Sequence, residues 1–280
     1  MDISDANVKR LTEMAKRMRL SGLEMAVRSG NQGAHLGGSL SCIEIMAVLY
    51  GEILHIDPKN SLDPDRDVFM PSKAHCVLSH IPALAEKGFF ERDEIFKYLD
   101  DGERIVGHPY RPDIGFEYPG GSLGMAISVA IGMAISAKGR NSKRRFYVLL
   151  GDGELHEGSV WEAFMSAAHF GLDNLVAIID RNRLSYDGNT EEVMALDNLA
   201  KKLESFNWLV SECDGHDIKS LLQAFSEEER NKPHVIIANT IKGKGVSFIE
   251  NKADWHHHTL SQKEYDQAVE EVVSGGVKVK

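Results

Sequence analysis

The chain reads FYVLLGDGE at residues 146–154 and LVAIIDRNR at residues 175–183. In each stretch a short run rich in aliphatic and aromatic residues ends in polar residues, which is typical of a buried parallel strand. The segment 159–170 between them has the length and composition of a helix. In an open parallel sheet ligands bind at the carboxyl ends of the strands, where Asp152 and Asn182 would both lie. The sequence therefore predicts a strand, turn, helix and strand unit with a ligand at this end.

The residues at these strand ends favour a metal-bound diphosphate. Mg²⁺ prefers oxygen ligands, one or two from side chains and the rest from phosphate or water. Asp152 would supply a charged oxygen, Asn182 a neutral one, and the backbone carbonyl near Leu184 a third. Gly151 and Gly153 let the backbone pass close to phosphates, and the N-terminus of the following helix favours their charge. A simple turn is the alternative for GDG, and the placement of Asn182 disfavours it.

Six motifs, in order along the chain, resemble those of the transketolase family, whose members use thiamine diphosphate. They read AHLGGSLS at 34–41, RD at 66–67 with SKAH at 72–75, GHP at 107–109, GGSLG at 120–124, GDGELHEG at 151–158, and Asn182 with DG at 187–188. The resemblance runs from about residue 10 to about residue 260. It implies an α/β thiamin diphosphate-binding fold, a doubly wound, mostly parallel sheet with helices on both faces. The implied cofactors are thiamine diphosphate and Mg²⁺, with Ca²⁺ or Mn²⁺ as substitutes.

The resemblance also implies which residues hold the cofactor. They are His75, Gly121, Ser122, Leu123, Gly124, Gly151, Asp152, Gly153, Glu154, Asn182 and Leu184. The metal ligands among them would be Asp152, Asn182 and the carbonyl of Leu184. His75 would contact the diphosphate, and the glycines at 121 and 124 would line the thiazolium and phosphate side.

The catalytic residues implied by the resemblance are His35, His108, His256, Glu157 and Glu162. His35 and His108 would hydrogen-bond the sugar hydroxyls or the oxygen that becomes negative, since imidazole can donate or accept near neutral pH. His256 is favoured within the run 256–258, for which a metal-avid surface is the alternative. Glu157 and Glu162 would join a proton-sharing network across a subunit interface; without the resemblance they would be an exposed helix face.

Family members are more than twice as long as this chain, and their second domain binds the pyrimidine and supplies the activating glutamate. Residues 1–280 are therefore expected to be one diphosphate-binding domain, the N-terminal subunit of a split transketolase. The expected partner is a C-terminal transketolase subunit in an α2β2 assembly, and the expected substrates are sugar phosphates. Alternatives are the corresponding subunit of a deoxyxylulose-phosphate synthase-like or 2-oxoacid dehydrogenase-like enzyme, and a non-catalytic binding module.

Composition is consistent with one large α/β domain, because 280 residues with 42% hydrophobic content can bury a full core. A net charge of −10 argues against a nucleic-acid or membrane surface. The three cysteines are few, odd in number and lack metal spacing, and no secretory signal is visible, so a cytoplasmic location is expected.

Periodicity predicts the remaining elements. Helices are expected over 5–30, 40–55, 122–138, 217–228 and 261–273, strands over 208–213 and 235–240, and a loop over 242–260. The helix at 122–138 is apolar all round, which indicates burial or an interface, with Ser122 as its N-cap. The last helix is expected to be exposed.

Overall fold

Five parallel strands form the central sheet of the protein, which a computed structural model describes for residues 1–275. The strands are β1 (Val68–Pro71), β2 (Phe146–Gly151), β3 (Leu175–Arg181), β4 (Leu209–Asp214) and β5 (His234–Asn239). Their order across the sheet is β1-β2-β3-β5-β4, and every neighbouring pair is parallel. All four strands expected from the sequence are present, so the expected α/β parallel-sheet fold is confirmed.

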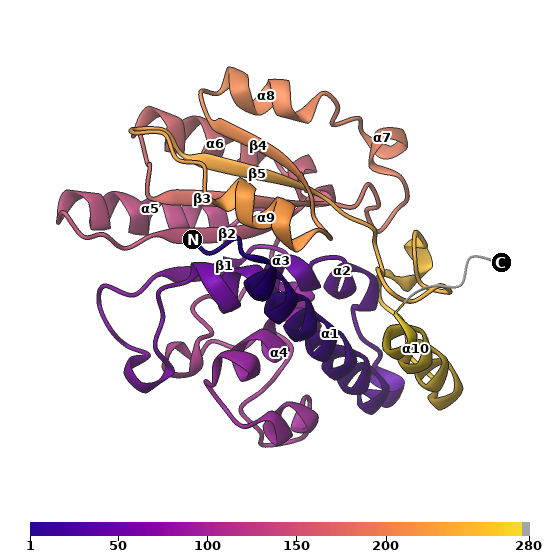
Figure 1. Ribbon diagram of the computed structural model, residues 1–280. Coiled ribbons are helices and arrows are strands. Elements are labelled where there is room, and N and C mark those ends of the chain that lie inside the picture. Colours follow the sequence, from indigo (N-terminus) through magenta and orange to yellow (C-terminus); the bar gives the residue numbers. More distant parts are fainter. Residues whose placement is uncertain (276–280) are drawn as a thin grey trace.

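Helices cover both faces of this sheet (Figure 1). One face carries α1 (Asp5–Arg28), α2 (Leu36–Leu40), α3 (Ile43–Val48), α4 (Val77–Lys87) and α9 (Ile218–Phe225), with α10 (Gln262–Ser274) packed on α1. The other face carries α5 (Ala126–Gly139), α6 (Gly158–His169) and α8 (Leu199–Ser205), and α7 (Thr190–Val193) is a short turn. None of the helices within residues 1–275 combines the length and the hydropathy that a bilayer crossing requires.

Strand β2 shows why the apolar runs are continuous. Tyr147 and Leu149 pack into the core on the face that carries α1. Phe146, Val148 and Leu150 pack into the core on the face that carries α5. Successive side chains of a strand point to opposite faces, so a strand covered on both faces must be apolar at every position. This requirement makes β2 and β3 recognisable in the sequence.

Helix α5 begins later than expected, and its predicted cap is wrong. The helix starts at Ala126, the cap position is Met125, and Ser122 precedes both. The backbone between Ser122 and the helix turns through Gly124, which has a φ of 75°. The helix buries only one side: Met125, Val129 and Ile135 are exposed. An apolar helix with an uncovered side fits the interface alternative rather than full burial.

Three elements were not expected from the sequence, and each lacks a clear pattern. Strand β1 has only four residues and ends in Pro71, which lacks the donor that a longer strand would need. Helix α4 contains Pro82, which disrupts a helical pattern, and α8 is short. The helix predicted over 40–55 is in fact the end of α2, then α3, then a π turn over Leu49–Ile53. The exposed final helix is present as α10.

A buried histidine gives the core a pH dependence. His80 in α4 is 4% exposed, its Nε2 lies 2.7 Å from the hydroxyl of Tyr50, and it packs against Phe69 and Phe116. Burial lowers the pKa of His80 in the folded protein to about 3. As the pH falls below the ordinary histidine pKa, His80 is therefore protonated in the unfolded chain but not in the folded protein. The stability contributed by neutral His80 is therefore present above the ordinary pKa and is lost as the pH falls toward about 3.

We expect the free energy of unfolding to fall by about 2 kcal/mol through His80 between about pH 7.5 and about pH 5. Denaturant titrations at the two pH values would measure this loss. In His80→Gln the loss should shrink, because glutamine does not titrate, whereas His169→Gln at an exposed position of α6 should behave as wild type. An equal loss in wild type and His80→Gln would contradict the assignment.

Candidate active site

A cavity of about 440 Å³ opens at the carboxyl ends of four strands. β1 leads to Lys73 and His75, β2 to Asp152, β3 to Asn182, and β5 to Lys242. These are neighbouring strands in the sheet, so residues far apart in the sequence meet at one edge. The cavity is lined further by His35, Gly38, His108, Gly121, Leu123, Gly151, Gly153, Glu154, His156, Glu157, Leu184, Ser185, Tyr186, Asp187 and His256.

The predicted metal ligands Asp152, Asn182 and Leu184 lie together in this cavity. Asp152 is 1% exposed, and its carboxylate accepts hydrogen bonds from the backbone N–H groups of Gly153 (2.8 Å) and Arg183. Burial, with the neighbouring Asp180, raises the pKa of Asp152, so a bound cation would favour its charged form.

The donor set fits a hard divalent cation. A carboxylate, an amide and a backbone carbonyl supply oxygens only, and Mg²⁺ takes its remaining ligands from phosphate and water. Within residues 1–275 no three His, Cys, Asp or Glu side chains form a metal-binding group. The site therefore suits a metal that arrives with a diphosphate rather than a metal enclosed by protein ligands.

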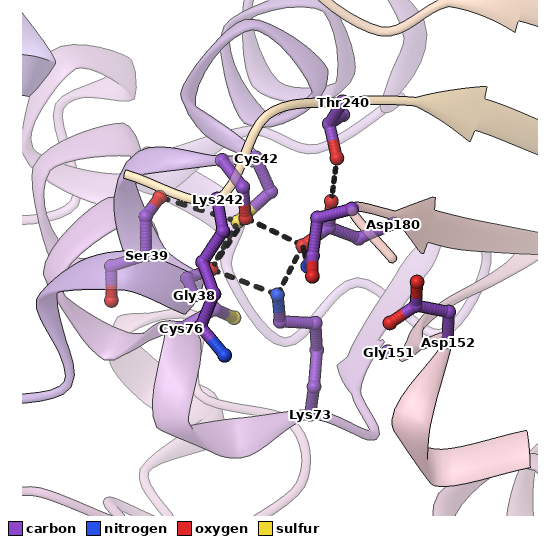
Figure 2. Close-up of polar contacts among 12 residues, drawn as sticks. Gly38, Ser39, Cys42, Lys73, Cys76, Gly151, Asp152, Asp180, Thr240 and Lys242 are labelled. Atoms are coloured by element: carbon purple, nitrogen blue, oxygen red, sulfur yellow. Dashed lines mark hydrogen bonds and ion pairs between the residues drawn. The ribbon is translucent and has the colours of Figure 1, made fainter. Parts of the chain in front are cut away.

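Asp180 organises the floor of the cavity (Figure 2). It is fully buried at the end of β3 and accepts hydrogen bonds from Lys73, Thr240 and Ser41, the last at 2.6 Å. It also accepts from the amide nitrogen of Asn182 at 3.1 Å. Only the nitrogen of an amide can donate to a carboxylate, so the Asn182 side-chain nitrogen faces Asp180 and its oxygen points away from Asp180. An oxygen in that orientation can serve as a metal ligand.

Lys73 shares this floor and was not among the residues predicted from the sequence. It is 1% exposed, pairs with Asp180 and donates to the carbonyl of Gly38 at 2.8 Å. Burial opposes its charge, but Asp180 outweighs burial and raises the pKa of Lys73. The cavity therefore holds a permanent ammonium group.

Lys242 is a second ammonium group missed by the sequence analysis. It is 2% exposed, and its Nζ donates to the carbonyls of Leu184 (3.0 Å) and Ser185 (3.2 Å) and to His256 Nδ1 (3.2 Å). Burial, with the nearby Lys73, lowers the pKa of Lys242 to about 8, so an anion in the cavity would strengthen its charge. Position was an available signal for Lys242 alone, because it follows the strand expected over 235–240, whereas the strand before Lys73 was not expected from the sequence.

Glu154 joins three segments around the cavity. Its carboxylate accepts hydrogen bonds from Ser72 and from the backbone N–H groups of Gly124 (2.7 Å) and Gly151 (3.1 Å). Burial raises the pKa of Glu154, and these three donors oppose that effect. Glu154 thus lines the cavity and also holds the glycine turn at residue 124 against the end of β2.

Three histidines meet at the mouth of the cavity. The ring centroids of His35 and His75 lie 5.4 Å apart, those of His75 and His256 5.0 Å, and those of His35 and His256 5.5 Å. Burial lowers the pKa of His35 to about 4 and that of His256 to about 3. Their imidazoles are therefore neutral near pH 7 and able both to donate and to accept. His108 also lines the cavity.

Within the histidine run, His256 lines the cavity, which agrees with its being the favoured member. His257 is exposed and its ring lies 4.6 Å from that of His35. His258 pairs its backbone with Ala34, at 2.9 and 3.0 Å, and its ring packs against Trp255. This pairing brings the segment 256–258 beside His35.

Three of the predicted site residues do not line the cavity. Ser122 is exposed, Gly124 is buried behind Glu154, and Glu162 is exposed on α6. Glu157 is the residue that precedes α6 and does line the cavity. The structure therefore separates Glu157 and Glu162, and only the first lies beside the other predicted residues.

The arrangement can hold a metal diphosphate. Asp152 and Asn182 present oxygen ligands, and the ammonium groups of Lys242 and of Lys73, which is paired with Asp180, lie in the same cavity. Gly121 has a φ of 106°, and a Cβ at this position would meet no atom within 4 Å. The cavity is therefore open space beside Gly121. Neutral imidazoles at the mouth could then act on a polar substrate.

Comparison with known proteins identifies the family of the chain. Residues 11–273 match the family model described as transketolase, thiamine diphosphate binding domain. The chain is 41% identical to an apulose-4-phosphate transketolase subunit of Actinobacillus succinogenes, covering 93% of this chain and 96% of the relative. It is 35% identical to human transketolase, covering 94% of this chain and 42% of the relative. The transketolase structure from Campylobacter jejuni aligns with a TM-score of 0.87 at 26% identity, over 95% of this chain and 43% of that one.

The chain therefore belongs to the transketolase family, as a thiamine diphosphate-binding domain. Its extent matches that of relatives named as single transketolase subunits, which it covers almost completely, rather than that of whole transketolases. It is an N-terminal transketolase subunit, as the motifs indicated.

Proposed function

We propose that this chain is the N-terminal subunit of a two-component transketolase, which transfers a two-carbon ketol unit from a ketose phosphate to an aldose phosphate. The enzyme uses thiamine diphosphate and Mg²⁺ and acts only with its partner subunit. One observation carries the proposal: Asp152 and Asn182 share a cavity with two lysine ammonium groups, Lys73 and Lys242. Oxygen ligands for a hard cation beside lysine ammonium groups suit a metal diphosphate.

Within the site this chain would hold the diphosphate end. Asp152, Asn182 and the Leu184 carbonyl would hold the metal, and Lys242 would contact phosphate oxygens with His75. The bound thiamine diphosphate supplies the nucleophile and electron sink of ketol transfer. His35, His108 and His256 would hydrogen-bond the sugar hydroxyls and move protons at the substrate oxygen, since neutral imidazoles can donate and accept.

The partner would be a C-terminal subunit that carries the pyrimidine-binding and C-terminal domains, leaving one diphosphate-binding domain here. Relatives of this length are named as subunits of a transketolase, which supports a second chain. An α2β2 assembly is supported by the uncovered apolar side of α5, by exposed Met165 on α6 and by exposed Phe170 directly after that helix, since oligomers favour closed two-fold symmetry. Glu157 and Glu162 would lie at this interface.

Three free, buried cysteines support a cytoplasmic location.

The direct test is co-expression of this chain with the C-terminal subunit, followed by a panel of ketose phosphate donors and aldose phosphate acceptors. Relatives named for apulose-4-phosphate and for 6-deoxy-6-sulfo-D-fructose justify adding branched and sulfonated sugars to the panel. Ketol transfer to at least one acceptor, dependent on thiamine diphosphate and Mg²⁺, is expected. Cofactor-dependent chemistry that transfers no ketol unit would contradict the proposal.

The histidines should separate into two classes. His35→Ala and His108→Ala are expected to lower kcat by about tenfold or more and to leave cofactor affinity near wild type, because each removes a group that acts on the substrate. His75→Ala should instead weaken thiamine diphosphate binding. Steady-state kinetics and calorimetry on the assembled complex would separate the two effects. Normal kinetics and binding in all three variants would contradict these roles.

A further inference from the structure

The backbone of a short loop, together with the contacts of Lys242 to Leu184, Ser185 and His256, positions the Lys242 ammonium. This loop, residues 241–244 and here called the lysine loop, follows β5 and crosses above α2. The N–H of Gly243 donates to the carbonyl of Gly37 at 2.9 Å, and a Cβ on Gly37 would lie 3.0 Å from the Lys242 side chain. The loop is therefore tightly packed on its cavity side, and a small shift of its backbone would move the ammonium.

On its other side the lysine loop is held at both ends by a buried polar network. The N–H of Ile241 donates to His216 Nε2 at 2.8 Å, and Arg19 Nε donates to the carbonyl of Lys244 at 3.0 Å. Glu44 joins the two: it accepts from Arg19 at 2.7 Å and lies 3.0 Å from His216 Nδ1. Arg19 and Glu44 are 7% and 9% exposed, and His216 is half-buried; all three line a second cavity on this side of the loop.

The hydrogen bonds determine the tautomer of His216. A backbone N–H can only donate, so Nε2 must accept, and the proton must lie on Nδ1, where it is donated to Glu44. Burial opposes the charge of Glu44, but Arg19 and His216 outweigh burial and lower the pKa of Glu44 to about 2. Glu44 is therefore ionised near neutral pH, and an ionised partner keeps His216 in the tautomer that accepts from Ile241.

We propose that His216 is a positioning residue for the cofactor: through Ile241 it holds the lysine loop so that Lys242 is directed at the diphosphate. Glu44 and Arg19 orient His216, so a network spanning α1, α3 and the turn before α9 acts on the cavity through one loop. None of the three network residues lines the cavity itself. This inference rests on the proposed function, because it assumes that the cavity binds thiamine diphosphate.

Two substitutions distinguish the two hydrogen bonds of His216. In His216→Asn the side chain can still donate to Glu44 but is too short to reach the Ile241 N–H. In His216→Gln the amide oxygen can take the place of Nε2 and accept from Ile241. In the complex with the C-terminal subunit, calorimetry with thiamine diphosphate and Mg²⁺ should show roughly tenfold weaker binding for His216→Asn and near wild-type binding for His216→Gln.

A double-mutant cycle with Lys242→Met separates positioning from general stability. If His216 acts through the ammonium, His216→Asn should cause little further loss of cofactor affinity in the Lys242→Met background. Thermal unfolding of every variant records structural effects separately. Unchanged affinity in His216→Asn, or an equal loss in both backgrounds, would overturn this inference. A wild-type complex that does not bind thiamine diphosphate would overturn the proposed function instead.

Discussion

Replacing Asp152 by alanine is expected to abolish Mg²⁺-dependent binding of thiamine diphosphate, with affinity lowered by about a hundredfold or more. The substitution would remove the one charged ligand of the proposed metal from a buried part of the cavity. The fold should survive, because Arg181, the buried partner of Asp152, keeps Thr190 at 2.7 Å and Glu191 at 2.6 Å. Calorimetry on the assembled complex, with and without Mg²⁺, measures the loss.

Asn182→Ala should have nearly the same effect, since it removes the neutral side-chain ligand. Asp266→Ala on α10 is the matched control, because that residue is exposed, lies outside the cavity lining, and its carboxylate accepts a hydrogen bond from Gln262 at 2.8 Å. It should bind the cofactor as wild type does. Cofactor affinity that survives in Asp152→Ala would show that the metal does not lie at the end of β2.

Ketol transfer should depend entirely on the partner subunit. The purified 280-residue chain is expected to bind thiamine diphosphate weakly and to turn over no sugar, because the proposed partner would supply the site for the pyrimidine end of the cofactor. Titration with the C-terminal subunit should restore activity in a saturable way, with an end point near equal amounts of the two chains. Robust ketol transfer by this chain alone would falsify the prediction.

A substitution on the exposed side of α5 tests whether the chain assembles through this surface. Val129→Glu places a charge on an apolar surface that we expect to be buried in the assembly, and burial of an unpaired charge is costly. It should lower the fraction of α2β2 complex seen by light scattering. Val273→Glu on α10, a valine that is also exposed but lies outside this surface, is the control and should assemble normally.

The parallel sheet and its proposed ligand-binding end could be predicted from the sequence, because both leave a pattern in residues that are neighbours along the chain. Strands β2 and β3 are covered on both faces, so their apolar runs are continuous and visible without any knowledge of the fold. Asp152 and Asn182 follow those runs directly, and parallel strands carry their ligands at such ends. β1 was not visible, because four residues ending in Pro71 form too short a pattern.

The histidine motifs indicated a family, but their geometry came only from the structure. His35 and His256 are separated by more than two hundred residues, and their rings meet because the backbone of His258 pairs with that of Ala34. No local pattern predicts that pairing. The start of α5 at Ala126 rather than Ser122 has a similar cause, since Glu154 holds Gly124 in a turn that delays the helix.

The sequence by itself determined the class of fold, the strand ends that carry the proposed metal ligands, and the family. Only the tertiary structure decided which charged side chains lie beside those strand ends. Asp180 pairs with Lys73, 107 residues away in the sequence, and Lys242 donates to the carbonyl of Leu184, 58 residues away. The reason is physical. Periodicity and turn chemistry act between neighbours in the chain, whereas a buried charge is stable only beside partners that the order of strands in the sheet brings together.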